Sequence, residues 1–157
     1  MKQLFAAFAL GALLATPASA IELQQVTSPM GRIGWLAQDS TIPFASIEVI
    51  FTGGAGLETA ERAGAVSMMT ALLSEGAGDL DAQGYATALE SLAGSVSFDA
   101  GRDQVTMSIR ALSENRAQVV DLALLALTEP HFDQVSLERV RAQTVASLER
   151  SALDPNT

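Results

Sequence analysis

The sequence predicts an α+β domain in which an antiparallel sheet carries helices on one face. Segments that alternate apolar and polar residues, as strands do, are interleaved with segments of helical apolar spacing, in the order ββααββαα. The strand segments come in adjacent pairs joined by short turns, which favours antiparallel pairing. With 157 residues, 48% of them hydrophobic, the chain suits one domain with its own core.

The first two expected strands cover residues 32–39 and 45–53. Residues 32–39 alternate apolar and polar side chains, and residues 45–53 are rich in β-branched and aromatic types. Pro43 lies between them, as prolines often do in turns. We therefore expect these two strands to pair with each other.

Two helices are expected next. The first runs from about Ala60 to the glycines at 76–78, and the second starts at Asp81, a plausible N-cap, and closes at Gly94. The residues expected to face the core are Ala63, Val66, Met69, Leu72 and Leu73 in the first helix and Tyr85, Leu89 and Leu92 in the second.

A hairpin and two further helices complete the expected order. Residues 95–101 and 103–112 alternate with the period of strands, with a turn at Gly101 and Arg102. A helix is expected over 114–128, with Ser113 as its N-cap and Glu129–Pro130 as its end. The last helix is expected over 134–152, with its inward residues at Leu137, Val140, Val145 and Leu148.

Residues 1–20 have the pattern of a cleavable signal peptide. Lys2 supplies the positive start, an apolar run follows, and Ala18-Ser19-Ala20 matches the small residues that signal peptidase recognises. The apolar run is shorter than the roughly 20 residues that span a bilayer, which disfavours a membrane anchor. We expect export to the periplasm, with no membrane insertion after cleavage and a mature domain over 21–157.

The charge excludes some partners and the composition excludes some chemistry. The net charge is −9, so the surface repels nucleic-acid phosphates and anionic lipid headgroups. The chain has no cysteine and one histidine, His131, which leaves little for a nucleophile–histidine pair. Since no second ligand stands at suitable spacing from His131, a loop histidine is favoured over a metal ligand. Arg139 and Arg141 are interpreted as part of a solvated helix face.

Four segments, taken in order, resemble the N-terminal domain of the insulinase-type peptidase family M16. They cover residues 28–56, 61–104, 126–133 and 138–156, and read SPMGRIGWLAQDSTIPFASIEVIFTGGAG, ERAGAVSMMTALLSEGAGDLDAQGYATALESLAGSVSFDAGRDQ, ALTEPHFD and ERVRAQTVASLERSALDPN. Members of that family have two such domains, each larger than residues 21–157. The resemblance therefore implies that this sequence is a fragment, without the remainder of its domain and without the second one.

Active members of that family carry the zinc motif His-x-x-Glu-His on the helix that resembles residues 64–75. Histidines four apart share one helix face and can bind one Zn²⁺, while the glutamate activates a metal-bound water. The resemblance puts Ser67, Thr70 and Ala71 at these three positions, and a third ligand near Ser147, with Glu149 two residues on. Alanine offers no donor atom and a neutral hydroxyl is a poor zinc ligand, so we predict no metal or cofactor in this chain.

The resemblance implies a non-catalytic subunit that pairs with a zinc-bearing M16 subunit in periplasmic peptide degradation or processing. A binding or scaffold protein on the same fold, without a proteolytic partner, is the alternative. An active metallopeptidase with displaced ligands, Glu149 among them, is a third. The strand at Ser95, Val96, Ser97 and Phe98 is the candidate for contact with peptide, because edge strands can pair with extended chains; the other interpretation is an internal strand of the sheet.

Overall fold

The computed structural model describes residues 22–153 of the chain. It forms two compact units, one up to Ile42 and one from Pro43 onward. The predicted signal peptide, residues 1–20, lies outside the described residues. Within residues 22–153 no helix has both the length and the apolar character needed to cross a membrane.

The first unit holds an antiparallel hairpin of β1 (Leu23–Thr27) and β2 (Ile33–Ala37). The turn closes where the Ser28 amide donates to the Arg32 carbonyl at 2.8 Å and the Gly31 amide donates to the Ser28 carbonyl at 2.9 Å. The predicted pairing of residues 32–39 with residues 45–53 is therefore wrong, because β2 pairs with β1 instead. The expected order had no strand at Leu23–Thr27, where polar side chains mask the alternation.

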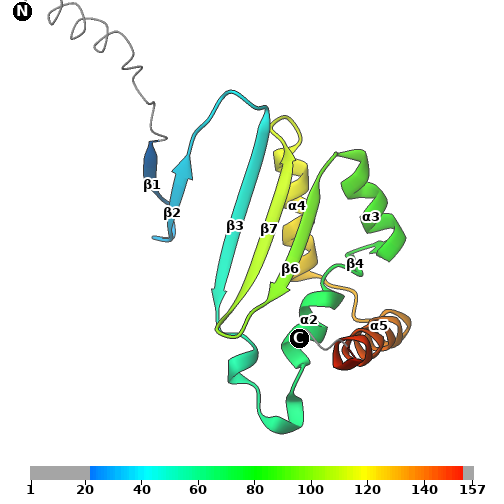
Figure 1. The fold of residues 1–157 in the computed structure, drawn as a ribbon. Helices are drawn as coiled ribbons and strands as arrows, with labels where there is room; N and C mark the ends of the chain where they lie inside the picture. The colour runs from blue at the N-terminus through cyan, green and yellow to red at the C-terminus, as the bar shows by residue number, and fades with distance from the viewer. Residues whose placement is uncertain (1–21, 154–157) are drawn as a thin grey trace, which may run out of the picture. The chain divides into compact units, whose positions relative to one another are not determined.

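The second unit is built on a three-stranded antiparallel sheet (Figure 1). Its strands are β3 (Phe44–Thr52), β6 (Ser95–Ala100) and β7 (Gln104–Leu112), in the order β3-β7-β6. The register places Ile109 of β7 opposite Ile47 of β3 and Val96 of β6. The predicted hairpin of residues 95–101 and 103–112 is confirmed, with β7 as the central strand.

The sheet has one apolar and one polar face because side chains alternate along a strand. On β7, Val105, Met107, Ile109 and Ala111 are buried, while Arg110 on the other face is exposed. Helix α4 (Arg116–Thr128) packs on the apolar face of β7 and β6. Antiparallel strands with helices on one face are the predicted fold class, which is confirmed.

Helix α2 (Ala65–Leu72) starts later than predicted. Two short 3₁₀ turns, η1 (Ala55–Leu57) and η2 (Ala60–Arg62), come first. Gly64 then has φ of 92°, a left-handed conformation that glycine adopts without strain and that a helix interior does not contain. Two short strands, β4 (Gly76–Ala77) and β5 (Leu80–Asp81), follow α2 and pair with each other.

Helix α3 (Ala82–Ser91) confirms the predicted N-cap at Asp81, whose Oδ1 accepts from the Gly84 amide at 2.7 Å. The predicted N-cap at Ser113 is wrong. Helix α4 begins at Arg116 after Asn115, and the Asn115 side chain donates to the Leu92 carbonyl at 2.9 Å instead of capping the helix. A contact with the end of α3 therefore fixes the start of α4.

The core lies between α4, α3 and the apolar face of the sheet. Val119 and Ala123 of α4 have no exposed surface, and Tyr85 of α3 is 2% exposed. Gly94, just before β6, lies so close to α4 that a Cβ there would come within 2.5 Å of Val119 Cγ2. This contact requires glycine for reasons of space.

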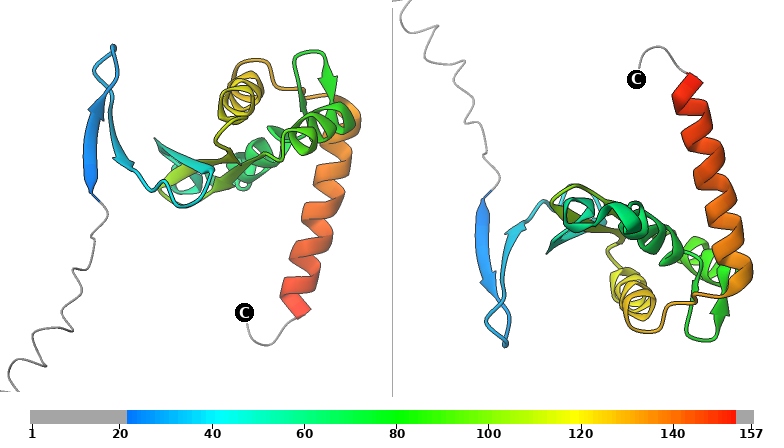
Figure 2. Two further views of the ribbon diagram at one scale, coloured as in Figure 1. Left: turned by 90° about the horizontal axis from the view of Figure 1, so that it is seen from above. Right: turned by 90° about the horizontal axis from the view of Figure 1, so that it is seen from below.

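Helix α5 (Gln134–Leu153) begins beside β4 and extends away from the core. In Figure 2, α4 lies on one side of the sheet seen edge-on, and the C-terminal half of α5 extends to the other side. Val140 is buried as predicted, but Val145 and Leu148 are exposed, and so is Met69 of α2. The prediction that these three face the core is wrong, because helical spacing identifies a common face and not what covers it.

Candidate functional site

The main candidate site is the α2–α5 cleft, defined as the cavity of about 490 Å³ between α2 and α5. Helix α5 contributes Arg141, Thr144, Val145 and Leu148, which recur at helical spacing and so share one face. The wall opposite consists of the end of η2 and the start of α2. Its lining residues are Arg62, Ala63, Gly64, Ala65, Ser67 and Met68.

A carboxylate from outside the helix holds the N-terminus of α2. Glu58 Oε1 accepts from the Val66 amide at 2.6 Å, and Oε2 accepts from the Gly64 amide at 2.7 Å. These hydrogen bonds, first that to Val66 and then that to Gly64, hold the pKa of Glu58 below its usual range. The free amides of the first turn, which would otherwise attract an anion, are thus partly satisfied within the chain.

The three motif positions do not converge on the cleft. Ser67 is exposed and lines it, whereas Thr70 is 4% exposed and its hydroxyl donates to the Ser67 carbonyl at 3.0 Å. Ala71 is half-buried and carries no donor atom. The available side chain is one serine hydroxyl, which does not fit the nitrogen, sulfur and carboxylate ligands of zinc.

The later helix adds no ligand to this cleft. Ser147 and Glu149 are both exposed and are not among the residues that line it. The lining contains no histidine, aspartate or glutamate. Over residues 22–153 as a whole, no group of three or more His, Asp or Glu side chains is placed to hold a metal ion.

One end of the cleft is tied together. Arg139 of α5 forms a bidentate ion pair with Glu75, which follows α2. Arg139 Nη1 lies 3.0 Å from Glu75 Oε1. Next to this pair, Ala77 of β4 bridges to Pro130. The His131 amide donates to the Gly76 carbonyl at 3.0 Å, and its ring Nε2 bonds the Gly78 carbonyl. His131 is therefore a structural tie, in line with its interpretation as a loop histidine.

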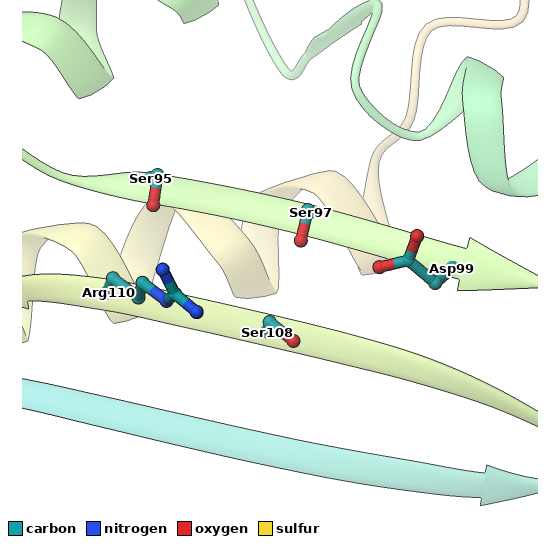
Figure 3. A pocket seen from close by; sticks show the side chains of 5 residues that line it. All are labelled: Ser95, Ser97, Asp99, Ser108 and Arg110. Carbon is teal, nitrogen blue, oxygen red and sulfur yellow. The ribbon is translucent and has the colours of Figure 1, made fainter.

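The strand predicted to contact peptide, β6, is an edge strand of the described sheet, since it pairs with β7 alone. Val96 and Phe98 point into the core, and Ser95 and Ser97 lie on the open face. There the two serines join Asp99, Ser108 and Arg110 around a shallow polar hollow of about 310 Å³ (Figure 3). Only the serine half of the predicted contact strand is thus available to a ligand on that face.

Two arginines line the candidate site without having been predicted there from the sequence. Arg62 and Arg141 line the α2–α5 cleft, and within residues 22–153 their guanidinium groups make no hydrogen bond or ion pair. The sequence pattern predicts Arg139 and Arg141 on one solvated helix face, but Arg139 binds Glu75 while Arg141 lines the cleft. The spacing of Arg141 to Thr144, Val145 and Leu148 was the available signal. The lining of the cleft thus combines two cations with apolar side chains.

Comparison with known proteins identifies a family and similar proteins of known sequence or structure. Residues 35–157 match the family described as Insulinase (Peptidase family M16). The non-peptidase homolog YmxG of Helicobacter pylori is 26% identical over 148 residues, which are 94% of this chain and 34% of that protein. A crystal structure of a peptidase M16 inactive domain from Pseudomonas fluorescens matches with a TM-score of 0.77 and 23% identity, over 86% of this chain and 33% of that one. The chain thus spans about a third of each relative.

Proposed function

This chain belongs to the insulinase family of peptidases, family M16, and we propose that it is a non-catalytic member that holds peptide for a zinc-bearing M16 subunit. The observation that carries the proposal is the donor set of the α2–α5 cleft. Ser67 is the motif position that reaches the cleft, and the lining holds no imidazole or carboxylate. Such a site can neither bind Zn²⁺ nor activate a water in the way an active member does.

The names of two similar proteins support a non-catalytic role. The Helicobacter pylori relative is described as a non-peptidase homolog, and the Pseudomonas fluorescens crystal structure as an inactive domain. Both match more than four-fifths of this chain. A protein that has the M16 fold without the zinc ligands can still serve through its surfaces. It can form part of the wall around a peptide and contact that peptide.

Two surfaces of the second unit are available to peptide. Strand β6 presents one free edge, and extended chains bind such edges through their main-chain groups. The α2–α5 cleft offers apolar walls and two cations. With the predicted signal peptide over 1–20, we propose that the protein works in the periplasm. The zinc would reside in the partner subunit.

The test is co-expression with a zinc-bearing M16 peptidase from the same genome, followed by purification through a tag on this protein. We expect the two proteins to co-purify, zinc to be found at one equivalent per complex, and peptide cleavage to be faster than with the peptidase alone. Failure to co-purify together with unchanged cleavage would favour a scaffold without a proteolytic partner. Stoichiometric zinc in this protein purified alone would instead identify a metallopeptidase with displaced ligands.

A further inference from the structure

The α2–α5 cleft combines an uncovered apolar wall with two cations that have no partner. Leu148 is 65% exposed and Val145 is 48% exposed, although both line the cleft together with Met68. Across residues 22–153, neither Arg62 nor Arg141 has a carboxylate within ion-pair distance, whereas Arg139 on the same helix does. A ligand that satisfies all these groups has an apolar part and an adjacent anion.

We propose that this cleft binds the C-terminal residue of a peptide, with its α-carboxylate on Arg62 and Arg141 and an apolar side chain between Met68 and Leu148. The inference rests on the proposed peptide-holding function and names the end of the peptide that is held. The inference assigns a binding role to residues next to Ser67, Thr70 and Ala71, the positions that correspond to the zinc motif of active family members.

The chemistry of arginine selects the carboxylate. A guanidinium presents parallel N–H donors that match the two oxygens of a carboxylate, and such charge-assisted pairs are stronger than neutral hydrogen bonds. The Ser67 hydroxyl, on the same wall, is a further donor for the anion. An ammonium group would be repelled here, so the amino end of a peptide is disfavoured.

The volume of the cleft and the net charge of the chain restrict the class of ligand further. About 490 Å³ lies within the range of small-ligand sites, so the cleft accommodates one residue with its neighbour and not a folded partner. The chain has a net charge of −9, which repels strongly anionic surfaces such as lipid headgroups. A peptide with one terminal carboxylate and an apolar last residue meets both conditions.

The probe is a short glycine- and serine-rich peptide that ends in leucine, labelled with fluorescein at its amino end and titrated with the purified protein. We expect saturable binding by fluorescence anisotropy. The same peptide with a C-terminal amide is expected to bind at least about tenfold more weakly, because the charged hydrogen bonds are lost. The same peptide ending in serine is expected to lose affinity through the missing apolar contact.

Matched variants locate the site. Arg141→Gln and Arg62→Gln are each expected to weaken binding of the free acid about tenfold and to remove its advantage over the amide. Arg102→Gln is the control, because the exposed guanidinium of Arg102 also has no partner in the described part of the chain, but it lies in the turn between β6 and β7 and does not line the cleft. Leu148→Ser is expected to weaken binding, and Val135→Ser, an exposed apolar residue elsewhere on α5, is its control.

Equal affinity for acid and amide, or no effect of either arginine variant, would overturn the proposal. Displacement by octanoate at the same concentration as by the peptide would overturn it in favour of a fatty acid. Self-association that Leu148→Ser abolishes, without any peptide binding, would assign the cleft to a second copy. Since the assay uses the protein alone, peptide binding without co-purification would refute the partner and leave this inference standing.

Discussion

The sheet–α4 core and the α2–α5 cleft are both lined by apolar helix faces, yet they differ in what covers those faces. Val119 and Ala123 of α4 are fully buried against the sheet, whereas Val145 and Leu148 of α5 stay exposed. Burial on this scale stabilises a fold, while an uncovered apolar face is available to another molecule. The core therefore supplies stability to the unit, and the cleft is the surface to which we assign binding.

The largest expected effect comes from truncating a core side chain. Met107 is 3% exposed, so Met107→Ala leaves a cavity and is expected to lower the free energy of unfolding by about 2–5 kcal/mol. Leu148→Ala is the matched change in the cleft and is expected to alter it by about 0.5 kcal/mol or less. Urea denaturation measures both. Similar losses for the two variants would break the division between core and cleft.

The pKa of the single tyrosine, Tyr85, measures how well the core excludes water. Burial raises the pKa of Tyr85 to about 12, and its hydroxyl donates to the Leu122 carbonyl at 3.2 Å. Because the folded pKa exceeds the unfolded value of about 10, this contribution to stability is complete below pH 10 and is lost as the pH rises toward 12.

Tyrosinate absorbance follows this titration without ambiguity, since the chain has one tyrosine. The folded protein is expected to titrate near pH 12 and the urea-unfolded protein near 10. Tyr85→Phe is expected to cost about 0.5–1.5 kcal/mol at neutral pH and to remove this alkaline loss of stability. A folded midpoint close to the unfolded one would show that water reaches α3 and α4.

A smaller effect is expected at the cleft wall, where Glu58 holds the start of α2. Its pKa is lowered by the Val66 and Gly64 amides, so its contribution is present above the unfolded pKa of about 4.3 and is lost as the pH falls through the lower folded value. Glu58→Gln is expected to reduce stability at neutral pH and to flatten its acid dependence. Glu90→Gln, an exposed change on α3, is the control. Identical acid unfolding of the two variants would contradict this role.

The smallest effect is expected for the ion pair between Glu75 and Arg139. Arg139 is 43% exposed, and exposed pairs are screened by salt. A double-mutant cycle with Glu75→Gln and Arg139→Gln is expected to give a weak coupling at low salt that fades at high salt. Coupling that persists in high salt would mean that the closed end of the cleft is better shielded than its exposure indicates.

Local sequence patterns correctly predicted the elements that form the core of the second unit. The alternation in residues 104–112, the cap at Asp81 and the stop at Pro130 depend on neighbours in sequence, and all three are found as expected. The misses depend on distant contacts. Strand β2 pairs with β1, which was not expected as a strand, and Asn115 is placed by the Leu92 carbonyl.

The candidate site was predictable in position and not in content. Resemblance led to Ser67, Thr70 and Ala71 on α2, and Ser67 does line a cleft with α5. The spacing did not show that the Thr70 hydroxyl would donate to the Ser67 carbonyl. It also did not show that Arg62 and Arg141 would line one cleft from two different elements. Such groups are brought together by tertiary packing, which a single sequence pattern does not encode.

The ties at β4 give the cleft a mechanical property. Pro130, His131 and the Glu75–Arg139 pair fix the first turns of α5. Its 20 residues span about 30 Å. Because these contacts lie at the N-terminal end of α5, a rotation of the helix by about 10° about that end would move its far end by about 5 Å. Leu148 lies toward that far end, so a modest change in angle is enough to alter the width of the mouth.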